Sequence, residues 1–479
     1  MSMSTLDDLD SKLQLDDKSG SPVVITTPQE FSIQDPQPQY RLYKRRWAGL
    51  VALFFLNIAP AAAWPYFGAI TIATSKRFGF TTNEVNWLGN SVSIMFLPVS
   101  VSVPLLVKKF GVRNTCLGAA FCLLISAWVR FAGTADSLSV RGRYALMLFA
   151  QILVGVPQSI FQVIGPTYSE QWFDVKFRTT ATMIIAISNP LGAALGQLIS
   201  PILDDPKDSI LLLGIIGTVI APLAFLIGRA PALPPTFAAS TPSIGLTPML
   251  RALVGKARDG EPHMDKRERL DFVLLVFIFG ICVQCASTFS LLSNEMLEPY
   301  GYNSDQAGFV GAALLFSGII AAALAAPLLD RVLTHHLNIV IRVLVPSLAA
   351  GWIGWIFAVK KDGLGGLFAN AIAIGICSLI LLPTGLEVGV EVSRNSEASS
   401  AIIWCFANTM DVIFIPIFQA LRAGDNADPP RNHRRGLIVN ASLMGLCSVL
   451  VFGIRGRQRR RELDIEKMRE RQAQGAQDA

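Results

Sequence analysis

Charged residues are scarce in this chain of 479 residues, where Asp, Glu, Lys and Arg together make up 16%. A soluble protein carries about 25%, whereas here hydrophobic residues reach 52% and come in long runs. Twelve membrane helices of about 20 residues each would use roughly half of the chain. The composition therefore argues against a soluble enzyme, a disulfide-rich secreted protein and a nucleic-acid-binding protein. It predicts an all-α membrane protein.

The sequence also lacks the marks of nucleotide or redox chemistry. It contains no Gly-Lys-Ser/Thr loop to hold phosphates, and all seven cysteines lie inside hydrophobic runs, so no disulfide framework is visible. Cys282 and Cys285 have the spacing of a redox pair, but we interpret them as small packing residues within a membrane helix. We expect no enzyme activity, no cofactor and no bound metal.

The hydrophobic runs fall into two blocks of six. We predict spans near 48–73, 85–107, 114–133, 145–168, 178–203 and 209–228, then near 270–294, 306–328, 338–359, 365–390, 399–421 and 436–454. Five parts follow: a disordered cytosolic tail (1–43), a six-helix half (44–228), a proline-rich, basic cytosolic linker (229–269), a second six-helix half (270–454) and a basic cytosolic tail (455–479).

Basic residues predict the orientation. They gather in alternate loops, and the positive-inside rule then places both termini in the cytosol, although three arginines before the last span oppose this: Arg431, Arg434 and Arg435. An internal repeat supports two related halves. Val103–Leu106 closes the second span and Ala326–Leu329 closes the eighth, 223 residues later (327 minus 104). Duplicated halves are typical of carriers that rock about a site at the membrane midplane.

Loops after the second and eighth spans carry a recognisable pattern. Lys108–Arg113 and Asp330-Arg331 resemble the gating-loop signature of the major facilitator superfamily, which is an aspartate followed by basic residues around a glycine. Val107 occupies the acidic position of the first copy, so its charge relay is incomplete. The alternative is that these are ordinary basic residues of cytosolic loops.

A closer resemblance covers about 400 residues, and it identifies the chain as similar to the feline leukemia virus subgroup C receptor-related family within that superfamily. The segments that carry it are Tyr43–Trp47, Ala61–Tyr66, Asn86–Leu88, Gln158 with Trp172-Phe173, Asn189–Gly196, Leu291–Met296, Pro383–Glu391 and Glu397–Ser400. The resemblance implies a carrier of small solutes. Members are associated with choline and ethanolamine, one branch with heme, and a lysosomal branch with a pyridoxine-like vitamin.

The resemblance implies two cavity residues, Trp64 on the first helix and Gln158 on the fourth. A tryptophan face attracts a quaternary ammonium by ~2 kcal/mol or more when desolvated. A glutamine amide offers hydrogen bonds without burying a full charge. Pro65 would loosen the first helix beside Trp64, as happens where a helix lines a cavity. The alternatives are an interfacial anchor for Trp64 and an interhelical hydrogen bond for Gln158.

The sequence departs from the family at two other cavity positions. The family's tyrosine on helix seven falls on Ser287, with Phe289 the nearest aromatic residue. Its glutamine on helix eleven falls on Thr409, flanked by Asn408 and Asp411. An aromatic cage for choline is therefore expected to be half missing. This weakens the case for choline as the substrate more than the case for a small solute in general.

Asp411 is an ionisable residue inside a predicted span, where burial costs ~2.5–3.5 kcal/mol on insertion scales and usually marks a substrate or proton path. We favour a role in balancing a cationic substrate. Two alternatives stay open: Asp411 carries a coupling proton, or it is a structural residue bonded to a neighbouring polar group.

Two acidic residues near the inner end of helix ten predict a gate. Glu387 and Glu391 lie one turn apart, and Arg178 or Arg394 could pair with them in a cytoplasmic clasp. The small residues of Asn189–Gly196 suit close contacts between the two halves.

The sequence therefore predicts a monomeric secondary transporter of a small, cationic organic solute that works by alternating access. The alternatives are a proton-coupled carrier of a vitamin-like ring, a heme transporter, and a non-transporting receptor or sensor on the same fold. The plasma membrane is the default location, with a vacuolar or lysosomal membrane as the alternative.

Overall fold

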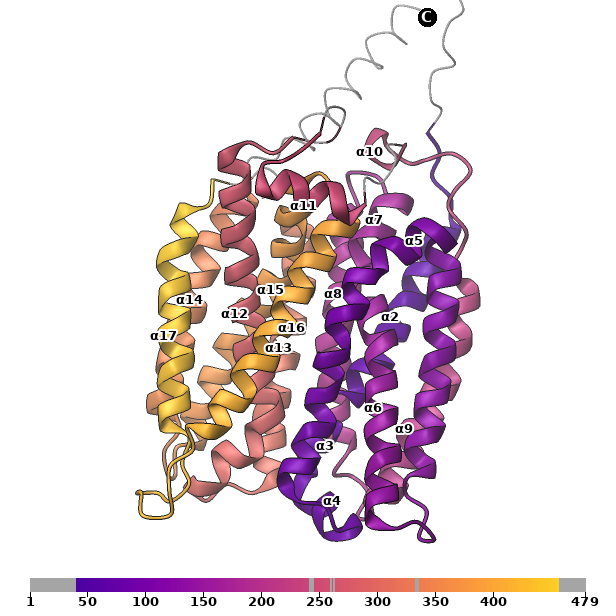
Figure 1. The fold of residues 1–479 in the computed structure, drawn as a ribbon. Helices are drawn as coiled ribbons and strands as arrows, with labels where there is room; N and C mark the ends of the chain where they lie inside the picture. Colours follow the sequence, from indigo (N-terminus) through magenta and orange to yellow (C-terminus); the bar gives the residue numbers. More distant parts are fainter. Residues whose placement is uncertain (1–39, 241–244, 259–260, 262, 332–335, 456–479) are drawn as a thin grey trace, which may run out of the picture. The chain divides into compact units, whose positions relative to one another are not determined.

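The computed structural model describes residues 40–240, 245–258, 261, 263–331 and 336–455. Almost all of both predicted tails, 1–43 and 455–479, therefore lies outside the described residues. All regular secondary structure in the described ranges is helical (Figure 1). This agrees with the all-α membrane protein that the composition predicts.

Eleven helices in the described part are long and apolar enough to cross a membrane, and one of them crosses twice. Helix α5 (Thr82–Ala132) begins at a capping box made by Thr81 and Glu84, and it is interrupted at Gly111. Gly111 has a φ of 76°, a left-handed conformation that favours glycine, so the chain turns there. Its two limbs are the predicted second and third spans, which gives the twelve predicted spans.

The remaining helices follow the predicted order closely. Those of the first block are α2 (Arg45–Ala63), α3 (Tyr66–Ala69), α4 (Thr71–Phe78), α6 (Val140–Val163), α7 (Gly165–Trp172), α8 (Arg178–Ile199), α9 (Pro206–Ile220) and η1 (Ala221–Leu226). Those of the second block are α12 (Lys266–Leu297), η2 (Glu298–Tyr300), α13 (Ser304–Arg331), α14 (Leu337–Ala358), α15 (Leu364–Ser393), α16 (Ser396–Ala420), α17 (Arg434–Leu450) and η3 (Val451–Gly453).

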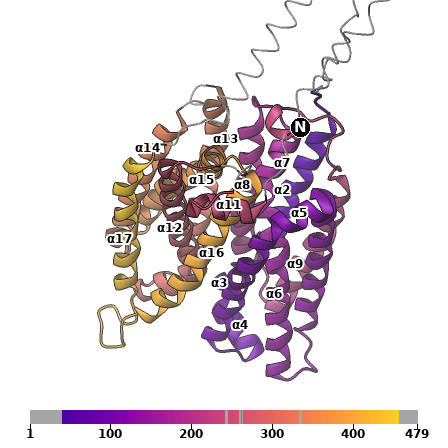
Figure 2. The ribbon, with the colours of Figure 1, turned by 45° about the horizontal axis from the view of Figure 1, so that its top comes forward.

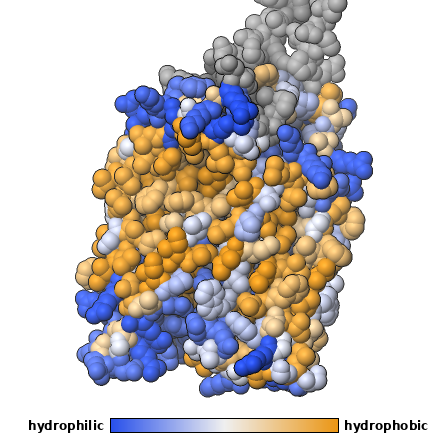
Figure 3. All heavy atoms as spheres, viewed as in Figure 1, coloured by the Kyte–Doolittle hydropathy of each residue, from blue (hydrophilic) through white to orange (hydrophobic). Residues whose placement is uncertain are grey.

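The two blocks form two helical bundles that lie side by side (Figure 1). They meet where α5 packs on α16 and α8 packs on α13. Hydrophobic side chains form a belt around the middle of the face shown in Figure 3, with hydrophilic residues toward both ends. Such a belt is the surface that hydrocarbon requires, and it leaves the junction between the bundles as the place for a polar site.

The first span, predicted near 48–73, is divided into several helices, and the first break falls where Pro65 was expected to loosen the helix. Helix α2 ends at Ala63, and Trp64 and Pro65 separate it from α3. Pro65 lacks a backbone N–H to continue the helical ladder, so the backbone turns at this point. The predicted linker 229–269 also contains two short helices that the sequence did not indicate, α10 (Phe237–Ser240) and α11 (Leu246–Val254). Helix α11 contacts both α5 and α16 (Figures 1 and 2).

The two glycines of the Asn189–Gly196 segment pack within the first bundle and do not join the two halves as we expected. A Cβ atom on Gly196 would collide with the carbonyl oxygen of Ala62 in α2. Gly192 is likewise in contact with Ile58 and Ala61 of the same helix. Close backbone contact of this kind is how membrane helices pack without a hydrophobic driving force between them.

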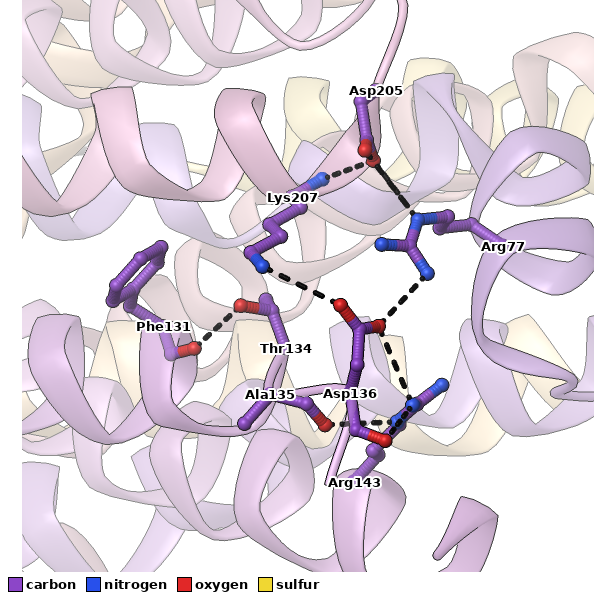
Figure 4. Close-up of polar contacts among 8 residues, drawn as sticks. All are labelled: Arg77, Phe131, Thr134, Ala135, Asp136, Arg143, Asp205 and Lys207. Carbon is purple, nitrogen blue, oxygen red and sulfur yellow. Dashed lines mark hydrogen bonds and ion pairs between the residues drawn. The ribbon is translucent and has the colours of Figure 1, made fainter. Parts of the chain in front are cut away.

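A charged cluster ties together three loops at the end of the first bundle opposite to the start of α2 (Figures 1 and 4). The Asp136 carboxylate lies 3.3 Å from Arg77 Nη1, 3.5 Å from Arg143 Nη2 and 3.6 Å from Lys207 Nζ. Arg77 also donates from Nε to Asp205 at 3.3 Å. The hydrogen bond from Arg77, together with the charges of Arg77 and Lys207, lowers the pKa of Asp136. This cluster links the end of α4, the loop between α5 and α6, and the start of α9.

Candidate functional site

A cavity of about 110 Å³ lies between the two bundles. Both bundles contribute to its wall, through α5, α6, α8 and the break after α2 on one side and through α12, α13, α15 and α16 on the other. The residues that give it chemical character are Trp64, Ser93, Gln158, Gln162, Asn189, Phe279, Cys282, Ser287, Ser290, Ser378, Trp404, Asn408 and Asp411.

The break in the first span brings Trp64 to this cavity. Trp64 is half-buried and caps the C-terminal end of α2, directly before Pro65. Gln158 reaches the cavity from the middle of α6 and is 5% exposed. The carbonyl oxygen of Gln158, Oε1, has no hydrogen-bond partner in the described part of the chain.

One face of α16 supplies three further cavity residues. Trp404, Asn408 and Asp411 are spaced by four and three positions, so they share one face of the helix. The Trp404 ring packs edge-on against Phe279, with the ring centroids 5.2 Å apart. Asn408 donates from Nδ2 to the carbonyl oxygen of Trp404 at 2.9 Å. This face therefore presents an aromatic ring, an amide and a carboxylate together.

Several polar atoms of the cavity wall have no partner among the described residues. These atoms are Ser93 Oγ, Gln158 Oε1, Trp404 Nε1 and Asp411 Oδ1, and all four residues are buried. A buried polar atom without a hydrogen bond costs about 1–3 kcal/mol. Buried polar groups are normally satisfied, so unpartnered groups that line a cavity indicate that a ligand or water completes them.

The wall of the cavity contains one acidic side chain and no basic one. Asp411 is 2% exposed and interacts with the Ser287 hydroxyl. Among the residues that line the cavity, none carries a positive charge. Because no cation of the protein balances this side chain, it can either pair with a positively charged ligand or take up a proton.

Two predicted substrate-binding residues lie away from the cavity wall. Phe289 is buried and packs against Trp355, with the ring centroids 4.8 Å apart. The Thr409 hydroxyl donates to the carbonyl oxygen of Cys405 at 2.7 Å, on its own helix. Of the seven predicted residues, the structure thus brings five to the cavity: Trp64, Gln158, Ser287, Asn408 and Asp411.

The predicted gate residues contact several different elements. Glu387 on α15 accepts a 2.7 Å hydrogen bond from the Thr182 hydroxyl on α8, which joins the two bundles. Glu391 is buried one turn later. Arg178 donates to the Thr236 hydroxyl at 2.9 Å, and Arg394 binds Glu268 at 2.6 Å. The side chains of two further predicted residues, Asp330 and Arg331, lie outside the described part of the structure.

A second hydrogen bond joins the bundles at the opposite end. Asn86 on α5 donates to Glu295 on α12 at 2.8 Å, and Arg422 lies 3.9 Å from the same carboxylate. The two bundles are thus hydrogen-bonded near both ends of the cavity. Such paired contacts are suited to gates that open in turn.

Comparison with known proteins identifies this architecture. Residues 48–410 match the sequence profile of the Major Facilitator Superfamily, which is 363 of the 479 residues (410 − 48 + 1). The chain belongs to the Major Facilitator Superfamily. It is therefore a multi-pass membrane transporter with a small-molecule substrate, and it is not an enzyme.

Several members of this superfamily resemble the chain along most of its length. The choline/ethanolamine transporter flvcr2b of Danio rerio is 26% identical over 402 residues, which are 79% of this chain and 78% of the relative. Solute carrier family 49 member A3 of Xenopus tropicalis is 24% identical over 429 residues (87% and 85%). The choline/ethanolamine transporter FLVCR2 of Homo sapiens is 24% identical over 389 residues (78% and 71%). These relatives confirm the predicted resemblance to the feline leukemia virus subgroup C receptor-related family.

The sequence interpretation missed one prominent cavity residue, Trp404. The signal was present, because Trp404 stands seven positions before Asp411 and seven positions are two helical turns. Gln162 was missed in the same way, one turn after Gln158 on α6. Helical periodicity applied outward from each predicted site residue would have found both.

Proposed function

We propose that this transporter carries a small organic cation of the choline or ethanolamine kind by alternating access. The observation that carries the proposal is the pairing of Asp411 with two tryptophans, Trp64 and Trp404, around one cavity without a basic side chain in its wall. A desolvated cation over an aromatic face gains ~2 kcal/mol or more. The names of the relatives, choline/ethanolamine transporters, support the same chemistry.

Trp404 changes the expectation for the aromatic cage. The residue at the family's tyrosine position is Ser287, and we expected half of the cage to be missing as a result. Trp404 stands on the opposite bundle from Trp64, so a cation between them would contact both halves of the transporter. A ligand that contacts both halves can couple its binding to their relative motion.

The other solutes considered fit this cavity less well. Heme is a large anionic macrocycle with two carboxylates, whereas the cavity measures about 110 Å³ and contains the carboxylate of Asp411. A neutral ring carried with a proton stays open as a second candidate, because an unpaired intramembrane carboxylate is also suited to proton transfer.

Uptake into liposomes tests the proposal. The purified protein is reconstituted, and accumulation of labelled choline, ethanolamine, pyridoxine and hemin is compared at limiting concentration. Trp64→Ala should lower cation affinity at least roughly tenfold, because a contact of ~2 kcal/mol is lost. Trp64→Phe should retain part of the cation affinity, and Gln158→Ala should impair transport while the protein is expressed at its normal level.

A receptor or sensor on the same fold would give a different result. It would bind the labelled cation to the reconstituted protein without accumulating it inside the vesicle. Normal uptake by Trp64→Ala at limiting cation would remove Trp64 from the site and leave it as an anchor.

We also propose that both termini face the cytosol and that 44–228 and 270–454 are the two moving halves. The support is the position of the basic residues. Lys108, Lys109 and Arg113 follow the second span, and Lys176 and Arg178 precede the fifth, at the end of the bundle where α2 begins (Figure 1). Single cysteines placed in the two tails should react with an impermeant reagent only after the membrane is permeabilised. Reaction of one tail alone in intact cells would contradict an even number of spans.

A further inference from the structure

A second pocket, of about 380 Å³, lies at the end of the first bundle where α2 begins. It shares no lining residue with the central cavity. Its wall is made by the start of α2, the second limb of α5, the last residue of α7 and the segment after η1. The lining residues are Tyr43, Arg45, Arg113, Trp172 and 228–232.

Three arginines surround this pocket, and none of its lining residues is acidic. Within the described part of the chain, Arg45, Arg113 and Arg229 make no ion pair and no side-chain hydrogen bond. The neighbouring Arg46 differs, because it lies 3.4 Å from Asp174. Three guanidinium groups left without counter-charges around one pocket form a strongly positive site.

Other groups of the wall also point to an anion. Trp172 is 6% exposed, and its indole N–H has no acceptor among the described residues. Helix α2 begins at Arg45 without a side-chain cap or an acidic residue in its first turn. The second limb of α5 begins just before Arg113, so the starts of two helices lie at this end of the bundle, where the helix dipole favours an anion.

Gly228 shapes the pocket. A Cβ atom at this position would lie 2.7 Å from Trp172 Cζ2 and 3.7 Å from Arg45 Nε. The absence of a side chain therefore allows the backbone of 228–232 to pass directly over the indole ring. The segment brings Arg229 to the same pocket as Arg45.

We infer that this pocket binds a phosphate group, either that of an anionic phospholipid headgroup or that of a soluble phosphate. Arginine is suited to phosphate because its planar guanidinium group donates two hydrogen bonds to two phosphate oxygens. The pocket lies at the end of the bundle that the basic residues assign to the cytosol, where anionic lipid headgroups gather. Tyr43 and Trp172 add the aromatic rings that are typical of the membrane interface.

Equilibrium binding to the full-length protein tests this site independently of transport. Dioctanoyl phosphatidic acid, dioctanoyl phosphatidylcholine and inorganic phosphate are titrated calorimetrically into the protein in neutral detergent. We expect phosphatidic acid to bind more tightly than phosphatidylcholine. Arg113→Gln with Arg229→Gln should weaken it by roughly 25-fold, at about fivefold for each arginine.

Two controls make the result specific. Arg435→Gln removes an exposed arginine at the opposite end of the molecule and should leave the affinity unchanged. Arg229→Gln alone changes an exposed loop residue, so it tests the site even if the double variant does not fold.

Arginine-dependent binding of phosphatidic acid without binding of inorganic phosphate would assign the site to lipid. Arginine-dependent binding of both would assign it to soluble phosphates as well. Equal affinity of the wild-type protein and the arginine variants for both probes would overturn the inference. Because the readout is binding at a separate pocket, its failure leaves the proposed cation transport untouched.

Discussion

Replacement of Asp411 by asparagine tests the electrostatics of the central cavity directly. The change keeps the size of the side chain and its contact with Ser287, but it removes the group that can carry a negative charge or a proton. Asp411 Oδ1 has no partner among the described residues, so the change breaks no hydrogen bond of the protein at that atom and tests the proposed interaction with the substrate. If Asp411 balances the substrate, Asp411→Asn should weaken binding of a permanently charged cation.

The size of the effect follows from the burial of the carboxylate. Two unit charges 4 Å apart interact by ~4 kcal/mol at an effective dielectric constant of 20. Desolvation of both charges offsets part of this energy, and hydrogen bonds to charged groups contribute ~1.5–3 kcal/mol net. We therefore expect the dissociation constant of a quaternary ammonium to rise about 10- to 150-fold.

Counterflow with and without a pH step distinguishes the three roles of Asp411. A substrate-balancing carboxylate predicts weaker binding and slower counterflow, which higher substrate concentration restores. A proton-carrying carboxylate predicts normal counterflow but no accumulation driven by pH, because an amide resembles the protonated acid. Asp425→Asn, which removes an exposed loop carboxylate bound to Arg431, is the matched control. Unchanged affinity, counterflow and pH response in Asp411→Asn would refute the electrostatic reasoning and leave the residue structural.

Three further changes test the fold and the site. Trp404→Leu should lower cation affinity by roughly 30-fold, for a cation–π contact of ~2 kcal/mol, whereas Trp352→Leu, which removes a buried tryptophan outside the cavity wall, should not. Gly196→Val should lower the melting temperature in detergent, because the added atoms collide with Ala62. Gly118→Val is the control and should be tolerated, because a Cβ atom at Gly118 has no neighbour within 4 Å. Equal melting temperatures of the two variants would contradict the packing of α8 on α2. Asp136→Asn should lower the melting temperature at neutral pH, and the difference should disappear in acid. The pKa of Asp136 is lowered in the folded state, so its carboxylate stabilises the fold at any pH above the ordinary aspartate pKa. This stabilisation is lost as the pH falls through the lowered folded-state pKa. A difference that persists in acid would assign the effect to packing.

The twelve spans were predictable because hydrophobic length alone decides whether a helix can cross a membrane. The exact break inside the first span was not predictable. Pro65 indicated a weak point, but hydropathy does not show that α2 ends at Ala63 and that α3 starts a new helix at Tyr66. Helix α11 was missed because nine residues in a polar linker carry no membrane signal, and its position depends on contacts with α5 and α16.

The cavity residues were predictable only where helical geometry agreed with the resemblance. Ser287 lines the cavity together with 279, 283, 286 and 290, which is the repeat of one helix face. Phe289 lies two positions from Ser287, or about 200° around the helix, so it points to Trp355 instead. Thr409 is displaced by about 100° from Asn408 for the same reason. The resemblance located the right helices, and helical periodicity decides which of their residues face the cavity.

The contacts of the two bundles also favour a rocking motion over internal rearrangement. Inside each bundle, glycines bring backbones into direct contact, as with Gly196 against Ala62 in the first and Gly375 against Leu314 in the second. Separating such surfaces would lose many packing contacts at once. Near the two ends of the cavity, by contrast, the bundles are joined by Thr182 with Glu387 and by Asn86 with Glu295, and each such hydrogen bond contributes a net ~0.5–3 kcal/mol. If the substrate contacts both Trp64 and Trp404 as proposed, its binding energy offsets the cost of opening one end at a time, while each bundle moves as a rigid body.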